Sequence, residues 1–381
     1  MVTREYAGLT EYSGGIGTQY ASLAPALQRL GHEPLVVTAC WDEPRTVVHE
    51  GVPVHLVRAT RLGWSFAVDE VIRREGPFDV VYAPEWGGDA WRYSRRKDCG
   101  ALVTNLTTSL EQLLFLSPEW KRPAGLRLHH ELQKRRERTQ ARRSDALAPC
   151  TRVIHEWASE LWQLDGIPSE VLPNMVDVQR VRSLAGGERP EGYPGGGPVV
   201  AFSGRLEIRK GPHVLVQAMQ RVWDEVPRAQ LVLFGLDCEW GSGRMSDHLM
   251  TLAGVHSSRL HVLGARPPDE LFAGLAAADV VALPSLWENF ALAALEALAI
   301  GCPIVATTGS GFGEFMEDGV NALLVPPRDP AALGETLLRL LRDPALRERL
   351  SHDARATAER YAAAPVAEQH ARFFERVADN G

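Results

Sequence analysis

Short runs of Val, Ile, Leu and Ala recur along almost the whole chain, separated by amphipathic stretches. Within each run the apolar residues are continuous and do not alternate with polar ones, which is typical of strands buried on both faces. In the first half this pattern predicts strands at Pro34–Ala39, Asp79–Ala83, Ala101–Thr104, Ala146–Pro149 and Glu170–Pro173. In the second half it predicts Pro198–Ser203, Gln230–Gly235, Leu260–Gly264, Asp279–Leu283, Cys302–Ala306 and Ala322–Val325.

Helical periodicity fills the spaces between these runs, for example at Ile16–Leu30, Pro212–Val226 and Ala331–Leu341. Strands that alternate with helices predict an α/β fold with parallel sheets covered on both faces. One further strand is expected at about Val2–Tyr6. It is short for a central strand, which is what a truncated start of the chain would leave.

A chain of 381 residues exceeds one ordinary core, so two domains are expected. Residues 185–197 contain six glycines and two prolines, a composition that supports neither a helix nor a strand interior. We therefore predict a linker at 185–197 between domains at 1–184 and 198–363.

The overall composition narrows the functional classes. A net charge of −7 argues against a general nucleic-acid binder, which needs a basic surface. The five cysteines are scattered and form no C-x-x-C pair, which argues against disulfides and zinc and favours the cytoplasm. No apolar run approaches the ~20 residues of a membrane span. We expect a monomer or a homodimer.

The first candidate site is a glycine-rich loop, Ser13-Gly14-Gly15-Ile16-Gly17-Thr18, which opens the first predicted helix. Glycines let the backbone approach an anion, and a helix N-terminus offers free N–H groups. The loop is not a dinucleotide fingerprint, because the third glycine of G-x-G-x-x-G would fall at Tyr20. A tight turn without a ligand is the alternative.

The second candidate site follows the predicted strand Pro198–Ser203. Arg205 and Lys210 come between this strand and the helix that Pro212 begins. Cations at the carboxyl edge of a parallel sheet lie where such folds bind ligands, and both can neutralise phosphate. A solvated loop with surface cations is the alternative.

The third candidate site holds two carboxylates, Glu288 and Glu296, in an otherwise apolar stretch. A helix would separate them by about 12 Å, beyond the ~5–9.5 Å of a glycosidase pair. We expect them to bind two distant parts of one extended ligand, with the N–H groups of Phe290 to Leu292 facing a phosphate between them. A helix cap at Glu288 and a salt-bridged Glu296 are the alternative.

Together these motifs resemble the retaining glycosyltransferases of family 4. The resemblance rests on E-x7-E at Glu288 and Glu296, G-R-x4-K at Gly204–Lys210, the S-G-G-I-G loop, and Pro173-Asn174-x-Val176-Asp177. It implies the GT-B fold, with two Rossmann-like domains facing across a cleft and a final helix, within 364–381, that packs back on the first domain.

The resemblance also implies roles for the site residues. Arg205 and Lys210 would neutralise a diphosphate, Glu288 would contact sugar hydroxyls, and Glu296 would bind the ribose hydroxyls. The loop at Gly15–Gly17 would approach the donor from across the cleft. Further donor contacts are expected at Gly15, Ile16, Gly17, Asn289, Phe290, Ala291, Leu292, Gly235 and Arg266.

The implied reaction is transfer of a hexosyl group, with retention, from a nucleotide-sugar to a small-molecule or glycan acceptor. We expect a UDP-sugar rather than a GDP-sugar, and attack of the acceptor on the face that the diphosphate leaves. The chain has no D-x-D motif, so no metal or other cofactor is expected. A nucleotide-sugar epimerase, a phosphorylase of the same fold, and a catalytically idle binding module are the alternatives.

Several positions depart from the family pattern. Ala291 and Met175 stand where many relatives carry glycine, and Thr107 stands where many carry a sugar-binding histidine. Glu85 and Asp89 are candidates for an enzymic base, with a loop capped by Asp89 as the alternative. The very basic stretch 121–143 is expected to be a helix with a solvated face, or a lid over an acidic or phosphorylated acceptor, rather than a membrane contact. His129 and His130 on this stretch are expected to be bystanders.

Overall fold

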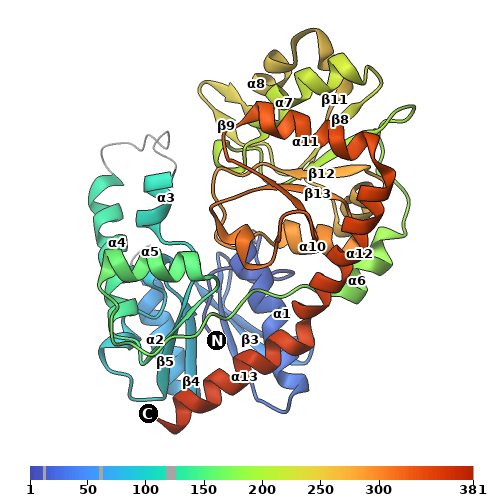
Figure 1. Ribbon diagram of the computed structural model, residues 1–381. Coiled ribbons are helices and arrows are strands. Elements are labelled where there is room, and N and C mark those ends of the chain that lie inside the picture. Colours follow the sequence, from blue (N-terminus) through green and yellow to red (C-terminus); the bar gives the residue numbers. More distant parts are fainter. Residues whose placement is uncertain (12–13, 60–62, 117–125, 381) are drawn as a thin grey trace. The chain divides into compact units, whose positions relative to one another are not determined.

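The computed structural model describes residues 1–11, 14–59, 63–116 and 126–380, and it divides the chain into two units (Figure 1). The first unit comprises Met1–Met175 together with Ala363–Gly381, and the second comprises Val176–Ala362. In the part of the chain described, no helix is both long and apolar enough to cross a membrane.

The division differs from the expected one, because the glycine-rich segment 185–197 lies within the second unit. The ring of Tyr193 stacks on Phe234 with centroids 6.5 Å apart, and Arg266 donates a hydrogen bond to the Glu191 carbonyl. Glycine and proline exclude regular structure from this segment, but they do not prevent it from packing on the sheet. The chain passes between the units at Met175–Val176 instead.

The first unit contains two three-stranded sheets. In one, β1 (Val36–Cys40) pairs in parallel with β3 (Val52–Arg58), and β3 pairs antiparallel with β2 (Arg45–His49). In the other, β4 (Val80–Pro84), β5 (Ala101–Leu106) and β6 (Ala146–Pro149) are all parallel. The helices are α1 (Gly15–Arg29), α2 (Trp64–Glu75), α3 (Leu110–Leu116), α4 (Arg127–Arg142), α5 (Arg152–Trp162) and α13 (Ala363–Asp379).

Two strands expected in the first unit do not form. Residues near the start make only an isolated bridge, Val2 to Val37, although the Val2 amide also donates to the Tyr82 carbonyl at 2.8 Å. The segment 170–173 runs beside β6 through single hydrogen bonds, as from the Glu170 amide to the Leu147 carbonyl, without forming a ladder. The bridge at Val2 nevertheless places the start of the chain between β1 and β4.

The second unit contains one six-stranded parallel sheet, in the order β11-β8-β7-β12-β13-β14. All six strands predicted in this half are confirmed to within two residues: β7 (Val199–Ser203), β8 (Gln230–Phe234), β11 (Leu260–Gly264), β12 (Val280–Leu283), β13 (Ile304–Thr307) and β14 (Leu323–Val325). A small hairpin, β9 (Glu239–Trp240) and β10 (Gly243–Arg244), lies outside this sheet.

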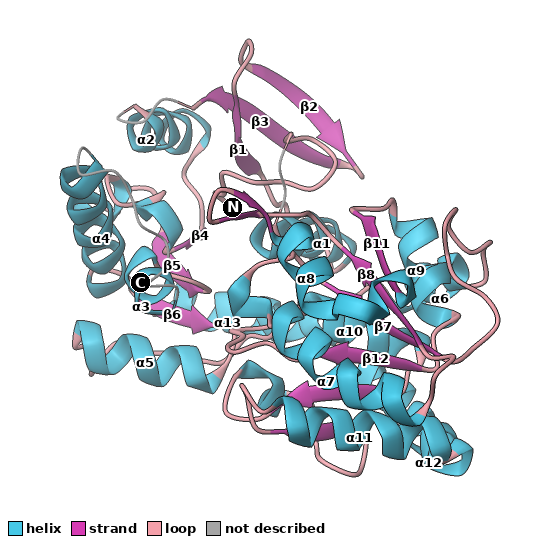
Figure 2. Ribbon diagram, turned by 90° about the horizontal axis from the view of Figure 1, so that it is seen from above, coloured by secondary structure: helices cyan, strands magenta, loops and turns pink. Residues whose placement is uncertain are grey.

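Helices cover both faces of this sheet (Figure 2). On one face, α7 (Pro212–Glu225), α8 (Met245–Ala253) and α11 (Pro330–Arg342) share a core with Leu231 and Leu233. On the other, α6 (Val178–Ala185), α9 (Pro268–Ala276) and α10 (Leu292–Ile300) pack together, and Gly274 of α9 touches the ring of Phe234. After α12 (Pro344–Arg360), the chain returns to the first unit, where α13 packs on α1.

Gly211, between the short 3₁₀ helix η4 (Ile208–Lys210) and α7, is held by backbone contact. Its φ is +72°, and a Cβ there would lie 2.0 Å from the Pro284 carbonyl oxygen. Gly319 has a φ of +74° but open space around it.

We predict that Gly211→Ala destabilises the second unit by about 3 kcal/mol or more, because steric overlap adds to left-handed strain. Gly319→Ala should cost about 1 kcal/mol, from strain alone. Urea unfolding of both variants measures the difference. Equal losses of stability would contradict the close approach at Gly211.

Candidate active site

The loop that follows β7 holds the first group of candidate residues. It is fixed to the end of β8 by hydrogen bonds from the Gly204 amide to the Phe234 carbonyl (3.0 Å) and from the Leu206 amide to the Leu236 carbonyl (2.9 Å). A Cβ on Gly235 would lie 2.0 Å from the Gly204 carbonyl oxygen, so only glycine allows this approach. The carboxyl ends of the neighbouring strands β7 and β8 therefore hold the Arg205 loop in place.

Lys210 and Glu288 form an ion pair inside the second unit, although 78 residues separate them. The same Glu288 oxygen accepts a hydrogen bond from the Ser285 hydroxyl at 2.9 Å, and Arg209 lies 3.8 Å from the other oxygen. Glu288 is only 4% exposed. The structure thus brings together the second and third candidate sites at the carboxyl ends of β7 and β12.

The pKa values of this pair reflect both burial and charge. Burial alone raises the pKa of Glu288, but Lys210 and Arg209 outweigh it and the net pKa is lowered. Burial lowers the pKa of Lys210, and the opposing effect of Glu288 only partly compensates. The Glu288 carboxylate is therefore ionised at neutral pH, and we treat the pair as fully charged because the two groups are in direct contact.

Two further charged residues of this loop were not identified from the sequence. The Glu207 carboxylate accepts hydrogen bonds from Arg205 at 3.1 Å and from Arg209 at 2.8 Å. Arg209 also donates to the Trp287 carbonyl. Glu207 thus orients both guanidinium groups. The signal available in the sequence was a carboxylate between two arginines in a loop that is expected to bind anions.

The segment from Asn289 to Leu292 leads into α10. Ala291 is the N-cap of this helix and provides no side-chain cap. The amides of Leu292 and Ala293 have no hydrogen-bond acceptor among the described residues. Phe290 is buried against Phe315, with ring centroids 5.0 Å apart. This helix end therefore has the free N–H groups that an anion requires.

Glu296 lies within α10, one helical turn after Leu292, the first residue of the helix. Burial raises the pKa of its carboxyl to about 7. Its carboxylate forms no ion pair or hydrogen bond with the residues that the structure describes, so the salt-bridged alternative is not observed. A half-buried acid without a partner costs folding free energy, and it is the kind of group that a ligand's hydroxyls would satisfy.

Gly235 and Arg266 lie just beyond the ends of β8 and β11. Arg266 is engaged within the protein: it donates to the Leu263 carbonyl at 2.9 Å and to Glu270 at 3.1 Å. Its side chain therefore shapes the loop after β11.

In the first unit, Gly15, Ile16 and Gly17 form the first turn of α1. The Gly14 amide donates to a Glu5 carboxylate oxygen at 2.8 Å, so an acidic side chain already lies at this helix N-terminus. Ser13 of the same motif is outside the described residues.

The other candidates in the first unit are buried in a polar cluster. Both oxygens of Glu85 accept from the Thr107 amide, at 2.7 and 2.9 Å, and one accepts from the Thr107 hydroxyl. Asp89 accepts from Arg4 at 2.6 Å. Glu85 and Asp89 are each 1% exposed. Their hydrogen bonds fix the loops after β4 and β5.

Glu137 of α4 completes this cluster and was not singled out in the sequence. It accepts hydrogen bonds from the amides of Gly87 and Leu110, both at 2.9 Å. Burial raises the pKa of Glu137 to about 7 and that of Glu85 to about 8. The sequence did not reveal Glu137, because the helix around it is very basic and only one side of α4 is buried.

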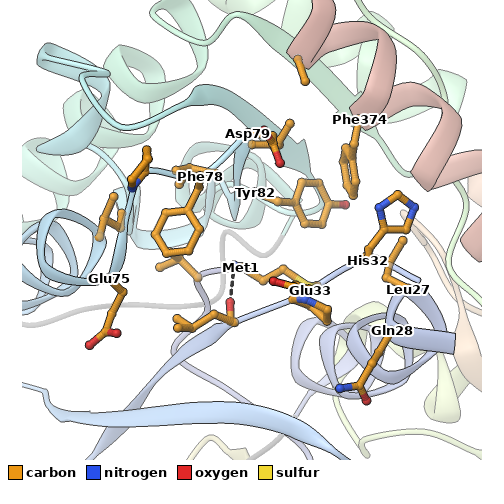
Figure 3. Close-up of a pocket in the computed structure, with 18 of the residues that line it drawn as sticks. Met1, Leu27, Gln28, His32, Glu33, Glu75, Phe78, Asp79, Tyr82 and Phe374 are labelled. Atoms are coloured by element: carbon orange, nitrogen blue, oxygen red, sulfur yellow. Dashed lines mark hydrogen bonds between the residues drawn. The ribbon is translucent and has the colours of Figure 1, made fainter. Parts of the chain in front are cut away.

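A cavity of about 980 Å³ in the first unit is lined by Met1, Leu27, His32, Phe78, Tyr82 and Phe374 (Figure 3). The residues beside it, such as Leu35 and Asp79, precede β1 and β4. It therefore lies at the amino ends of the strands, whereas parallel sheets bind ligands at the carboxyl ends. Size alone does not make it the active site.

Comparison with known proteins decides the family. Residues 13–180 match the Glycosyltransferase Family 4 domain, and residues 188–357 match Glycosyl transferases group 1. Over 382 residues the chain is 30% identical to a phosphatidyl-myo-inositol mannosyltransferase of Mycobacterium leprae, covering 97% of this chain and 94% of that protein. The chain belongs to glycosyltransferase family 4.

A second relative is a D-inositol 3-phosphate glycosyltransferase of Xylanimonas cellulosilytica, 33% identical over 402 residues, covering 96% of this chain and 93% of that protein. Among solved structures, a sucrose-phosphate synthase of Thermosynechococcus elongatus matches with a TM-score of 0.78 and 20% identity, covering 97% and 95% of the two chains. An Anabaena protein, Alr3699/HepE, in complex with UDP-glucose matches with a TM-score of 0.69 and 19% identity, covering 98% of each. This glycosyltransferase thus has the GT-B fold.

We predict that Glu296→Gln raises the stability of the protein above neutral pH and lowers its affinity for the donor. Burial raises the pKa of Glu296 from its ordinary value of 4.5 to about 7 in the folded state. The folded protein is therefore destabilised, relative to the unfolded chain, as the pH rises from 4.5 to about 7. At pH 8 the variant should be more stable than the parent by roughly 1–3 kcal/mol, and at pH 4 about equal. Its affinity for a nucleotide-sugar should fall at least tenfold.

Thermal unfolding and nucleotide titration measure the two effects. Glu348→Gln, at an exposed position of α12, is the matched control. An unchanged pH dependence of stability in the Glu296 variant would refute the burial argument.

Proposed function

We propose that this glycosyltransferase transfers a hexosyl group from a UDP-sugar to a hydroxyl group, with retention and without a metal ion. The observation that carries the proposal is the Lys210–Glu288 pair, held with Arg205 and Arg209 at the carboxyl ends of β7 and β12. Fixed cations at this edge stabilise a diphosphate leaving group as its charge develops.

In the proposed donor complex, Lys210 and Arg205 contact the diphosphate. The diphosphate competes with Glu288 for Lys210, so the Glu288 carboxylate is free to accept hydrogen bonds from sugar hydroxyls. The free amides of Leu292 and Ala293 supply further donors to a phosphate oxygen. Glu296 binds the ribose hydroxyls.

Retention follows from attack on the face that the diphosphate leaves. The anomeric C–O bond to the diphosphate breaks, the bond to the acceptor oxygen forms on the same face, and the acceptor's proton passes to the departing phosphate oxygen. Glu85 and Asp89 are buried in protein contacts, which favours this route over a base from the first unit.

We further propose that the acceptor is a polyol carrying a phosphate. Two of the relatives are named for inositol 3-phosphate and for phosphatidyl-myo-inositol. Incubation with UDP-glucose or GDP-mannose, with and without D-inositol 3-phosphate, tests the reaction. Acceptor-dependent release of UDP, with the donor's anomeric configuration retained in the product, supports it. An epimerase would change the sugar without an acceptor.

We predict that Lys210→Met and Glu288→Gln each lower kcat by about 10²–10³-fold or more. Each should also destabilise the second unit, because the remaining partner is left buried without its counter-charge. The double variant should recover most of the stability and none of the activity. Thermal unfolding and initial rates separate the two effects. Near-parental turnover in either single variant would overturn the site.

Metal independence predicts that EDTA leaves the initial rate unchanged, since guanidinium and ammonium groups supply the positive charge. The control adds Mg²⁺ or Mn²⁺ in excess over EDTA. Loss of activity that either ion restores would refute this part of the proposal.

A further inference from the structure

Two arginines of the first unit meet at the carboxyl ends of its strands. Arg4 follows the Val2 bridge beside β1, and the glycine pair Gly87-Gly88 follows β4. Arg136 reaches the same place from α4, which packs on this turn. This edge of a parallel sheet is where ligands bind, and it is the edge from which α1 begins with its glycine-rich turn.

The glycine pair makes room for both arginines. A Cβ on Gly88 would lie 2.6 Å from the Arg136 Cβ, and one on Gly87 would lie 3.1 Å from the Arg4 guanidinium carbon. Both glycines have positive φ, +75° and +64°. A larger residue at Gly88 would clash with the α4 backbone at Arg136, and one at Gly87 would displace the Arg4 guanidinium.

The charges at this place do not balance. Asp89 pairs with Arg4, at 2.6 Å. The guanidinium of Arg136 forms no hydrogen bond or ion pair with the described residues, and it lies over the ring of Trp91 at 5.0 Å. Burial, and then the neighbouring Arg4, lower the pKa of Arg136. A half-buried cation beside a second cation is stabilised by an anion between them.

The nearby acids do not supply that anion. Glu85 is bound to Thr107, and Glu137 is bound to the amides of Gly87 and Leu110. Both are buried and fixed by these contacts. Asp89 is engaged with Arg4, so none of these three carboxylates contacts the Arg136 guanidinium, which is left available to an anionic ligand.

We infer that Arg136 and Arg4 form an anion subsite of the first unit that binds the phosphate of the acceptor. A guanidinium presents two parallel N–H donors that match two phosphate oxygens, and the Trp91 ring, 5.0 Å away, provides an aromatic contact for Arg136. That the bound anion belongs to the acceptor rests on the proposed function. The same chemistry serves a soluble polyol phosphate and the phosphodiester headgroup of a lipid.

Arg136→Gln is the variant of choice, because Arg4→Gln would strand the buried Asp89. Arg135→Gln, on the exposed side of the same helix, is the matched control. Calorimetric titration with D-inositol 3-phosphate is run in saturating UDP or GDP, whichever binds, so that the donor's phosphate site is occupied. Myo-inositol without phosphate is the ligand control.

We predict that the parent protein and the Arg135 variant bind D-inositol 3-phosphate, while Arg136→Gln weakens binding at least tenfold. Sedimentation with phosphatidylinositol vesicles, against phosphatidylcholine vesicles, is the lipid arm. If Arg136→Gln weakens binding of D-inositol 3-phosphate only, the ligand of the subsite is a free phosphate. If it weakens binding to phosphatidylinositol vesicles, the ligand is a lipid headgroup. Binding that Arg136→Gln leaves unchanged in both arms, or no binding by the parent in either, overturns the subsite.

The proposed function fails separately. Absence of UDP or GDP binding by the parent protein would count against the donor site. The phosphate titration is then run without nucleotide, and it remains readable because it needs no turnover.

Discussion

The second unit depends on one buried ion pair. Lys210 and Glu288 belong to loops that leave different strands, and their contact fixes both loops at one edge of the sheet. Burying two charges is expensive, and two further contacts offset part of this cost: the Ser285 hydroxyl donates to the Glu288 oxygen that Lys210 contacts, and Arg209 lies 3.8 Å from the other oxygen. Backbone contacts close the same arrangement, since the Gly311 amide donates to the Glu288 carbonyl. A site built this way is organised before any donor arrives.

The first unit uses its carboxyls differently. Glu85 and Glu137 accept hydrogen bonds from backbone amides and have raised pKa values, so they act as internal acceptors that shape the turns after β4 and β5. Both carboxyls are buried, although the strands β4 and β5 beside them are mainly apolar. The second unit thus keeps the charged residues of its candidate site in ion pairs, while in the first unit Arg136 forms no ion pair with the described residues.

Much of the second unit was predictable because its strands are buried on both faces and read as unbroken apolar runs. The hairpin of β2 and β3 was not, since β2 is largely exposed and its residues resemble a loop. The segment 185–197 was misjudged as a linker because composition reports the absence of regular structure and says nothing about packing. Arg205, Lys210, Glu288 and Glu296 are predictable as candidate site residues from their places after strands and their match to the family motifs, whereas Glu207 and Glu137 act through contacts that sequence position does not encode.

In the proposed donor complex, the Glu296 carboxyl gives donor recognition a chemical signature of its own. With a pKa of about 7, it is half protonated in the empty enzyme near neutrality. Ribose hydroxyls that donate to the ionised form select that form and expel the proton. Nucleotide binding would then be coupled to proton release, and its apparent enthalpy would vary with the ionisation heat of the buffer.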